Sequence, residues 1–236
     1  SSSLAVVKTE SDSVALMRQQ NAFGPFAPSA TGEEQTVVLE NDLLKATFST
    51  KGGVVKEVEL KQHFKALYDE EENETKVPLK LLEDEKNEFE YFFPIANLPS
   101  GGVSTQDLHF QIVESSPTSV TFRANAVGGG YFEQKYTIQN GTYLLDYDIN
   151  FSNLNGVIDR STDALTLSWA NYLDKLERNT TYERRYSTVY FKTVEDDADY
   201  CSCTSDDTEE IDEQRIKWVS NSNQFFNSTL IADQTF

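Results

Sequence analysis

Apolar and polar side chains alternate along most of this chain, and no other feature limits so strongly what it can fold into. The clearest instance is residues 131–152, where two alternating runs flank the dipeptide Asn140-Gly141. A period of two residues places one set of side chains on each face of a β-strand, and Asn-Gly is a strong hairpin turn signal. The pattern predicts a hairpin with one apolar face. The expected inward set is Phe132, Gln134, Tyr136 and Ile138, then Tyr143, Leu145, Tyr147, Ile149 and Phe151.

Two further hairpins follow from the same pattern. One spans 44–60 and turns at Gly52-Gly53, and the other spans 108–124 and turns at Ser116-Pro117. Many antiparallel strands joined by short turns are typical of two sheets that share one core. We therefore predict an all-β fold, an antiparallel β-sandwich, that forms a single domain over residues 36–236. Later strands are expected at 165–172, 185–192, 216–220 and 225–232.

Residues 1–35 have a different character. Ser, Gln, Ala and Pro dominate them, and only Ser13–Gln20 has helical potential. Such a segment has too few apolar residues to bury much surface. We predict a flexible N-terminal linker.

Acidic residues outnumber basic ones by 39 to 20, which gives a formal net charge of −19. A surface this acidic repels phosphates, so the chain is not expected to bind nucleic acid. Three acidic segments, Asp69–Glu74, Glu83–Glu90 and Glu195–Glu213, interrupt the strand pattern. None has the spacing of an EF-hand calcium loop. We interpret all three as solvated loops and predict no metal site.

Few residues qualify for catalysis. His63 and His109 stand outside any known metal or nucleophile motif and are interpreted as surface histidines. Cys201 and Cys203 are too close in sequence for an unstrained bridge. We expect free thiols in a loop, with an intermolecular bridge as the alternative. The sequence therefore predicts no catalytic residue, no cofactor and no enzyme activity. Five aromatic residues of the later strands could line a groove, but we predict that they lie in the core. They are Trp169, Tyr172, Trp218, Phe225 and Phe226.

Two segments resemble the periplasmic domain of YidC-type bacterial membrane protein insertases. The first is Thr36–Gly53, a strand that ends in Lys51-Gly52-Gly53. The second joins Ile216–Ser220, with its Trp-Val pair, to Gln224–Ala232, which begins Gln-Phe-Phe. Leu167–Trp169 and Tyr186–Phe191 are also similar to that family, so the likeness extends over roughly residues 31–236.

The resemblance implies a β-supersandwich of the galactose-mutarotase type that faces the periplasm from the bacterial inner membrane. Residues 1–35 would then follow a first transmembrane helix, and the domain would continue in further strands beyond Phe236. Insertion itself would belong to a membrane-embedded core outside this chain, and no run of about 18 apolar residues occurs within it. The implied partners are accessory subunits of the Sec translocon and nascent membrane proteins.

The same fold analogy suggests a rival function. An aldose epimerase-like protein would, as that resemblance implies, need histidine and glutamate in one cleft, and only His63 and His109 are available for it. A carbohydrate-binding module is a further, weaker alternative. Fold alone does not carry function, so the chaperone or docking module is favoured. The sequence assigns no residue to partner binding and leaves the oligomeric state open.

Overall fold

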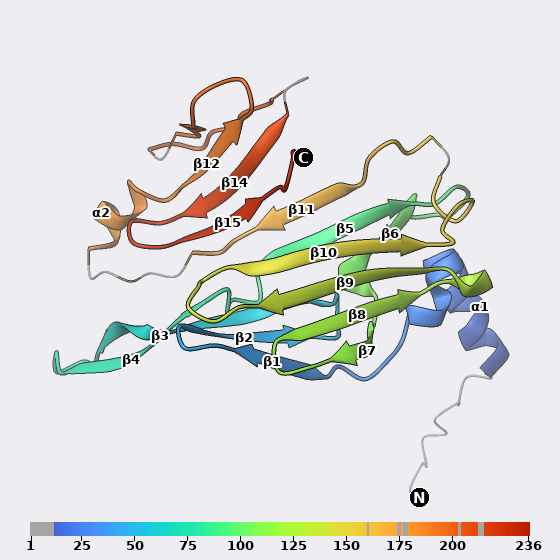
Figure 1. Cartoon of the computed structure of the whole chain (residues 1–236), viewed down its shortest axis with the longest axis horizontal. Helices are drawn as coiled ribbons and strands as arrows, with labels where there is room; N and C mark the ends of the chain where they lie inside the picture. Colours follow the sequence, from blue (N-terminus) through green and yellow to red (C-terminus); the bar gives the residue numbers. More distant parts are fainter. Residues whose placement is uncertain (1–11, 160, 174–175, 177–178, 203, 212–214) are drawn as a thin grey trace, which may run out of the picture. The chain divides into compact units, whose positions relative to one another are not determined.

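The structure, a computed structural model, describes residues 12–159, 161–173, 176, 179–202, 204–211 and 215–236. The described residues are mostly β-strands paired antiparallel, as the alternation predicts (Figure 1). Contacts divide the chain into two compact units, where the strand pattern alone predicted one domain. The first unit comprises residues 1–62 and 89–169, and the second comprises residues 63–88 and 170–236. Among the described helices, none is long and apolar enough to cross a membrane.

The first unit contains the three predicted hairpins. In its first sheet the inward side chains Leu44, Ala46 and Phe48 are fully or almost fully buried, and the chain turns at Gly52-Gly53 before it pairs back. The sheet has the order β1-β2-β3-β4. The first unit contains its strands β1 (Thr36–Glu40) and β2 (Leu44–Ser49) and the start of β3 (Val54–Tyr68), and the rest of β3 and β4 (Glu74–Leu81) belong to the second unit.

The second sheet runs in the order β10-β9-β8-β7 (Figure 1). Its strands are β7 (Gln111–Ser115), β8 (Ser119–Asn125), β9 (Tyr131–Ile138) and β10 (Leu145–Ser152). The inward residues of β9 are all buried, as predicted. In β10 Ile149 and Phe151 stay partly exposed instead, because this strand lies at the edge of its sheet and has a neighbour on one side only.

A third sheet and three short 3₁₀ turns complete this unit. The sheet order is β11-β5-β6, with β5 (Glu88–Pro94), β6 (Gly102–Ser104) and β11 (Thr166–Ala170). The turns are η1 (Gly24–Ser29), η2 (Thr105–Asp107) and η3 (Val127–Gly129).

Aromatic rings from the different sheets meet in one core. Phe48 of β2 lies 4.7 Å from Tyr136 of β9 between ring centroids. Phe93 of β5 lies 5.1 Å from Phe132 of β9 in an edge-to-face arrangement. The sheets thus pack face to face as a β-sandwich, with aromatic pairs at favourable distances.

A buried polar network holds the Gly52-Gly53 turn against β9. The Gln134 side-chain amide donates to the Gly52 carbonyl at 2.8 Å, and the Tyr136 hydroxyl donates to the Gly53 carbonyl at 3.0 Å. The Tyr147 hydroxyl in turn donates to Gln134 Oε1 at 2.7 Å. Burial raises the pKa of Tyr136 and Tyr147 well above that of a free phenol. Because buried polar groups must be paired, this network fixes where the turn sits.

The segment predicted as a linker is partly built into the fold. The expected helix is present as α1 (Asp12–Phe23), and η1 follows it. Phe26 of η1 is fully buried and stacks on Phe93 at 5.0 Å. The Ser29 hydroxyl donates to the Asn125 carbonyl at 3.0 Å. Residues 24–30 therefore pack as part of the first unit, held by the buried Phe26 ring and by the Ser29 hydrogen bond.

The three acidic segments are not loops throughout, as they were predicted to be. β4 starts at Glu74, the last residue of Asp69–Glu74, and β13 (Asp199–Tyr200) lies inside Glu195–Glu213.

Glu83–Glu90 was predicted to be a solvated loop throughout, but β5 begins at Glu88. Tyr91 and Phe93 point into the core, and the Glu90 carboxylate accepts a hydrogen bond from the Ser104 hydroxyl. The acidic composition hides an alternating pattern: Glu88 and Glu90 lie on the outer face of β5, and Tyr91 and Phe93 lie on its inner face.

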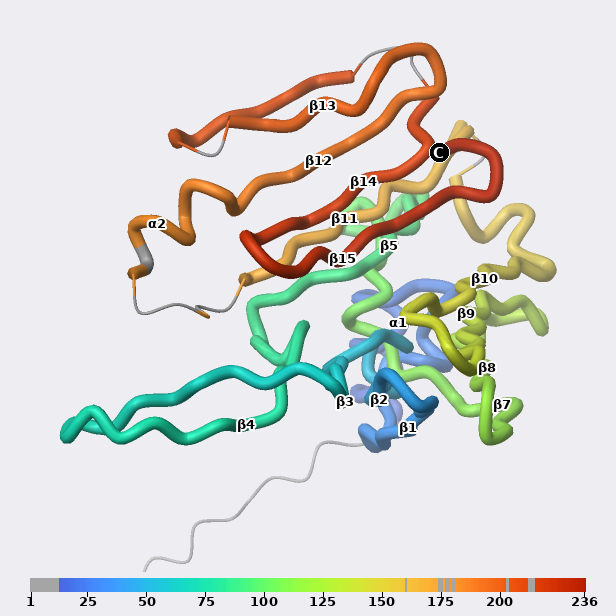
Figure 2. The backbone as a smooth tube through the Cα atoms, turned by 60° about the vertical axis from the view of Figure 1, so that its left-hand side comes forward, coloured from blue at the N-terminus to red at the C-terminus, as the bar shows by residue number. Residues whose placement is uncertain are grey.

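The second unit contains a four-stranded sheet in the order β13-β12-β14-β15 and the outer part of the β3–β4 hairpin (Figure 2). Among the buried hydrophobic side chains described, only Leu79 and Phe191 belong to this unit. Its own core is therefore much smaller than that of the first unit. The elements are β4 (Glu74–Leu81), α2 (Thr180–Arg184), β12 (Thr188–Thr193), β13 (Asp199–Tyr200), β14 (Ile216–Ser222) and β15 (Asn227–Ile231).

Candidate functional site

His109 is half-buried in an isolated bridge with Lys51. Its Nδ1 is buried and has no hydrogen-bond partner among the described residues. Burial, and then the charge of Lys51, lower the pKa of this imidazole. The nearby Glu34 carboxylate accepts hydrogen bonds from the Ser49 hydroxyl at 2.7 Å and the Lys56 amine at 3.1 Å. The carboxylate is thus held by other groups rather than by the histidine.

His63 lies on β3 within the second unit. Its ring meets Phe226 edge-on with centroids 5.3 Å apart. This is a packing contact of the kind aromatic rings favour. The two histidines therefore lie in different units, each with its own surroundings.

Cys201 is a free, half-buried thiol beside β12. Burial raises its pKa, and the carboxylates of Asp207 and Glu209 raise it further. A thiol with a raised pKa is a poor nucleophile, because the thiolate is the reactive form. Cys203 lies outside the described residues. Among the residues that the structure describes, no group of three or more His, Cys, Asp or Glu could hold a metal ion.

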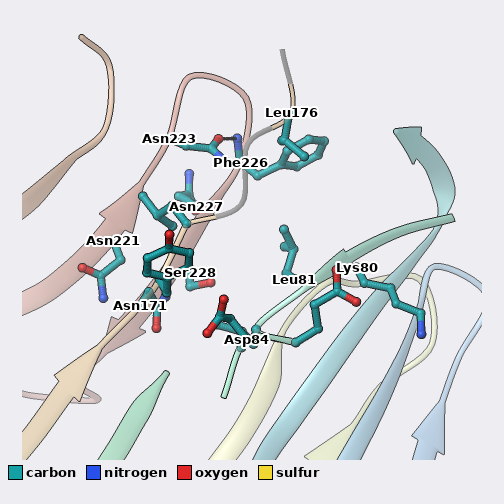
Figure 3. A pocket seen from close by; sticks show the side chains of 14 residues that line it. Lys80, Leu81, Asp84, Asn171, Leu176, Asn221, Asn223, Phe226, Asn227 and Ser228 are labelled. Atoms are coloured by element: carbon teal, nitrogen blue, oxygen red, sulfur yellow. Dashed lines mark hydrogen bonds between the residues drawn. The ribbon is translucent and has the colours of Figure 1, made fainter. Parts of the chain in front are cut away.

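A polar pocket lies within the second unit. Figure 3 shows the side chains of the β14–β15 hairpin on one side of it. On the other side lie Lys80 and Leu81, from the end of β4, and Asp84, from the segment after that strand. Asn223 shapes the hairpin, because its Oδ1 accepts hydrogen bonds from the amides of Phe225 and Phe226 at 2.8 and 2.7 Å. The polar lining residues are Lys80, Glu83, Asp84, Asn171, Tyr172, Asn221, Asn223, Asn227 and Ser228.

The room inside this pocket is about 30 Å³, which suits one or two waters. A small-molecule site usually offers about 300–1,000 Å³, so a sugar ring does not fit here. Asn171 Nδ2 is buried without a hydrogen-bond partner among the described residues, and the same holds for Asn87 Nδ2 and Gln224 Oε1 elsewhere in this unit. The pocket lining thus offers one unpaired amide donor, Asn171 Nδ2, to a small polar guest such as water.

A wider hollow of about 610 Å³ lies in the first unit. Gln20 and Pro25 form one side of it, and residues 95–98 and 156–159 form the rest. Its one acidic group, Asp159, already accepts hydrogen bonds from the amide and hydroxyl of Ser161 at 2.9 and 2.8 Å, and these lower its pKa. The lining is mainly apolar and backbone, without an aromatic platform or a reactive pair.

The five aromatic residues favoured for the core are not buried in it. Tyr172 and Phe225 are exposed, and Trp169, Trp218 and Phe226 are intermediate. That prediction is wrong because strand propensity does not reveal whether a sheet face is covered. Phe226 lines the polar pocket instead, and Lys86 lies over the Tyr172 ring at 3.9 Å.

Comparison with known proteins gives a consistent answer. The family model described as the YidC periplasmic domain matches residues 36–236. The chain belongs to this family. YidC periplasmic domains face the periplasm from the inner membrane of bacteria, and this sets the location of the chain. The match confirms the resemblance to the YidC periplasmic domain that was inferred from the Gly-Gly hairpin and the Gln-Phe-Phe segment.

Several relatives carry the name membrane protein insertase YidC. The protein of Parabacteroides distasonis is 32% identical over 226 residues, which cover 95% of this chain and 34% of the relative. That of Azobacteroides pseudotrichonymphae is 28% identical over 98% of the chain and 36% of the relative. That of Cytophaga hutchinsonii is 31% identical over 96% of the chain and 35% of the relative. The chain thus spans about a third of the length of the YidC relatives it matches.

Proposed function

We propose that this chain is the periplasmic domain of a membrane protein insertase and assists the insertion and folding of inner-membrane proteins. The observation that supports this is the family match over residues 36–236, together with relatives that bear the insertase name along nearly the whole chain. The rest of the parent protein would supply the membrane-embedded part.

The domain would work by binding rather than by catalysis. Its contacts would be with accessory subunits of the Sec translocon or with emerging membrane proteins. Acidic loops at the surface favour partners that carry positive charge and disfavour acidic ones. No cofactor is needed for such a role.

The domain organisation follows the same proposal. A tether after a first transmembrane helix would lead into the sandwich, and we place its folded end at Phe26, since this ring is fully buried. The segment before Gly24 would then act as the spacer.

The test uses the complete parent protein in cells whose own insertase can be depleted. We expect it to restore insertion of an inner-membrane reporter, measured by the accessibility of a periplasmic loop to protease. Deletion of residues 36–236 tests the contribution of the domain, with membrane abundance of the variant as the control. A parent protein that reaches the membrane but leaves the reporter uninserted would contradict the proposal.

The rival carbohydrate function is tested separately. Titration of the chain with a panel of aldoses, followed by tryptophan fluorescence and by the rate of mutarotation, should give no saturable change. Saturation by one sugar would favour the rival, and the hollow of about 610 Å³ in the first unit is where it should then be sought.

A further inference from the structure

In the four-stranded sheet of the second unit, the pairing of the strands shows which residues share one face. Tyr190 of β12 pairs with both Tyr200 of β13 and Ser220 of β14. Ser220 in turn pairs with Thr229 of β15. Paired residues in antiparallel strands point to the same side of the sheet. Trp218, two positions from Ser220, pairs with Ile231 of β15 and with Lys192 of β12, so these three residues join the same side. We call these seven residues the tyrosine face: Tyr190, Lys192, Tyr200, Trp218, Ser220, Thr229 and Ile231.

Large side chains of the tyrosine face are open to solvent. The exposed fraction is 38% for Tyr190, 55% for Tyr200 and 63% for Ile231. The two tyrosine rings lie 5.5 Å apart. Between the aromatic and apolar groups, the Ser220 and Thr229 hydroxyls bond to each other at 2.8 Å. The surface is therefore a row of rings and satisfied hydroxyls, the composition that adaptable protein-binding surfaces favour.

Charge is distributed unevenly around this face. None of its seven residues is acidic, in a chain with 39 acidic residues, and the amine of its one basic residue, Lys192, donates a hydrogen bond to the Asp196 carbonyl at 2.5 Å. The segments that connect β12, β13 and β14 carry exposed acids on both sides of β13, among them Glu195–Asp197 and Asp206–Asp207. Few charged residues on the face and charged groups around it are typical of a protein interface. The sign of these groups selects against acidic partners.

We propose that the tyrosine face binds an extended polypeptide segment whose apolar side chains are flanked by Lys or Arg. The apolar side chains would lie on Tyr190, Tyr200, Trp218 and Ile231, and the basic ones would meet the acidic segments beside β13. This inference rests on the proposed function, since such a segment is how an emerging membrane protein would present itself, and it names the site that would hold it.

The test uses the 236-residue chain and two synthetic peptides of about twelve residues. One alternates Leu and Phe with Lys, and the other has Glu at every Lys position. Trp169 and Trp218 are the two tryptophans of the chain, so Trp169→Phe leaves the fluorescence of Trp218 as the reporter. Calorimetry on the unmodified chain measures the same affinity without a substitution. We expect the Lys peptide to bind about tenfold or more tightly than the Glu peptide.

A matched pair of variants locates the binding. Tyr200→Ser with Ile231→Ser removes side chains that are 55% and 63% exposed, and Tyr143→Ser with Leu144→Ser removes side chains that are 47% and 62% exposed in the first unit. We expect the first pair to weaken the Lys peptide about tenfold and the second to leave it unchanged. Equal effects of the two pairs, equal binding of the two peptides, or no saturable binding would overturn the inference.

The outcome is separable from that of the proposed function. If the parent protein inserts the reporter while the tyrosine-face pair binds peptide normally, only this inference fails. If the peptide binds at the tyrosine face and the parent protein inserts nothing, the site stands and the insertase function fails.

Discussion

Gly53 shows at the scale of one residue why the Lys-Gly-Gly segment has the residues it has. Its φ is +66°, a region that side chains rarely adopt. A Cβ there would also lie 2.7 Å from Gln134 Nε2 and 3.0 Å from the Phe110 ring. Two separate constraints, one on the backbone and one on the space, therefore require glycine.

Gly53→Ala should lower the free energy of unfolding by about 2–4 kcal/mol, because strain and overpacking add. Gly141→Ala is the matched control: its φ is +74°, but nothing lies within 4 Å of its Cβ position. It should cost about 1 kcal/mol, from the backbone alone. Urea denaturation measures both, and equal losses would show that the contact with Gln134 does not matter.

The buried tyrosines predict how stability responds to alkaline pH. Burial raises the pKa of Tyr136 and Tyr147 in the folded chain, whereas unfolded phenols ionise near pH 10. Below about pH 10 both states keep their protons and stability is unaffected; above it only the unfolded state releases them, so stability falls.

Urea midpoints measured from neutral to alkaline pH should follow this course. The double variant Tyr136→Phe with Tyr147→Phe should show a smaller alkaline loss, although it is less stable at neutral pH. The exposed pair Tyr182→Phe with Tyr186→Phe is the control and should keep the full loss. The same alkaline slope in all three proteins would refute the role of the buried phenols.

At the scale of elements, η1 decides where the folded domain begins. Phe26→Ala should cost about 3–5 kcal/mol, since a fully buried ring stacked on Phe93 is removed and leaves a cavity. Leu16→Ala in α1 is the comparison, because Leu16 is exposed. It should change stability by no more than about 0.5 kcal/mol. A thermal unfolding series that finds both changes harmless would return residues 24–30 to the linker.

At the scale of the whole molecule, the two units differ in how much apolar surface each buries. The first contains nearly all of the buried hydrophobic side chains described, and the second contributes Leu79 and Phe191. Since apolar burial is the main favourable term in folding, the second unit should open more readily than the first.

Hydrogen exchange followed by mass spectrometry measures this opening. Amides of the β14–β15 hairpin should exchange at least about tenfold faster than those of the β8–β9 hairpin, although both are antiparallel pairs. The peptides to compare are one that contains Ser222 of the β14–β15 hairpin and one that contains Phe132 of the β8–β9 hairpin, since both residues lie in paired strands. Identical protection in both would mean that the chain unfolds as one cooperative body.

The sequence by itself determined the strand class, the three hairpins and the inward residues of β9. These follow from local rules, since a period of two and a glycine turn act within one pair of strands. The motif at Lys51-Gly52-Gly53 also carried the family resemblance.

Only the tertiary structure decided which faces are covered. Phe26 is buried because Phe93, far along the chain, meets it. Tyr190 and Ile231 are exposed although their pattern equals that of a buried strand. Alternation sorts side chains into two faces but does not say what packs on either, because burial depends on residues brought together from distant parts of the chain. The polar pocket and the tyrosine face both arise at this level.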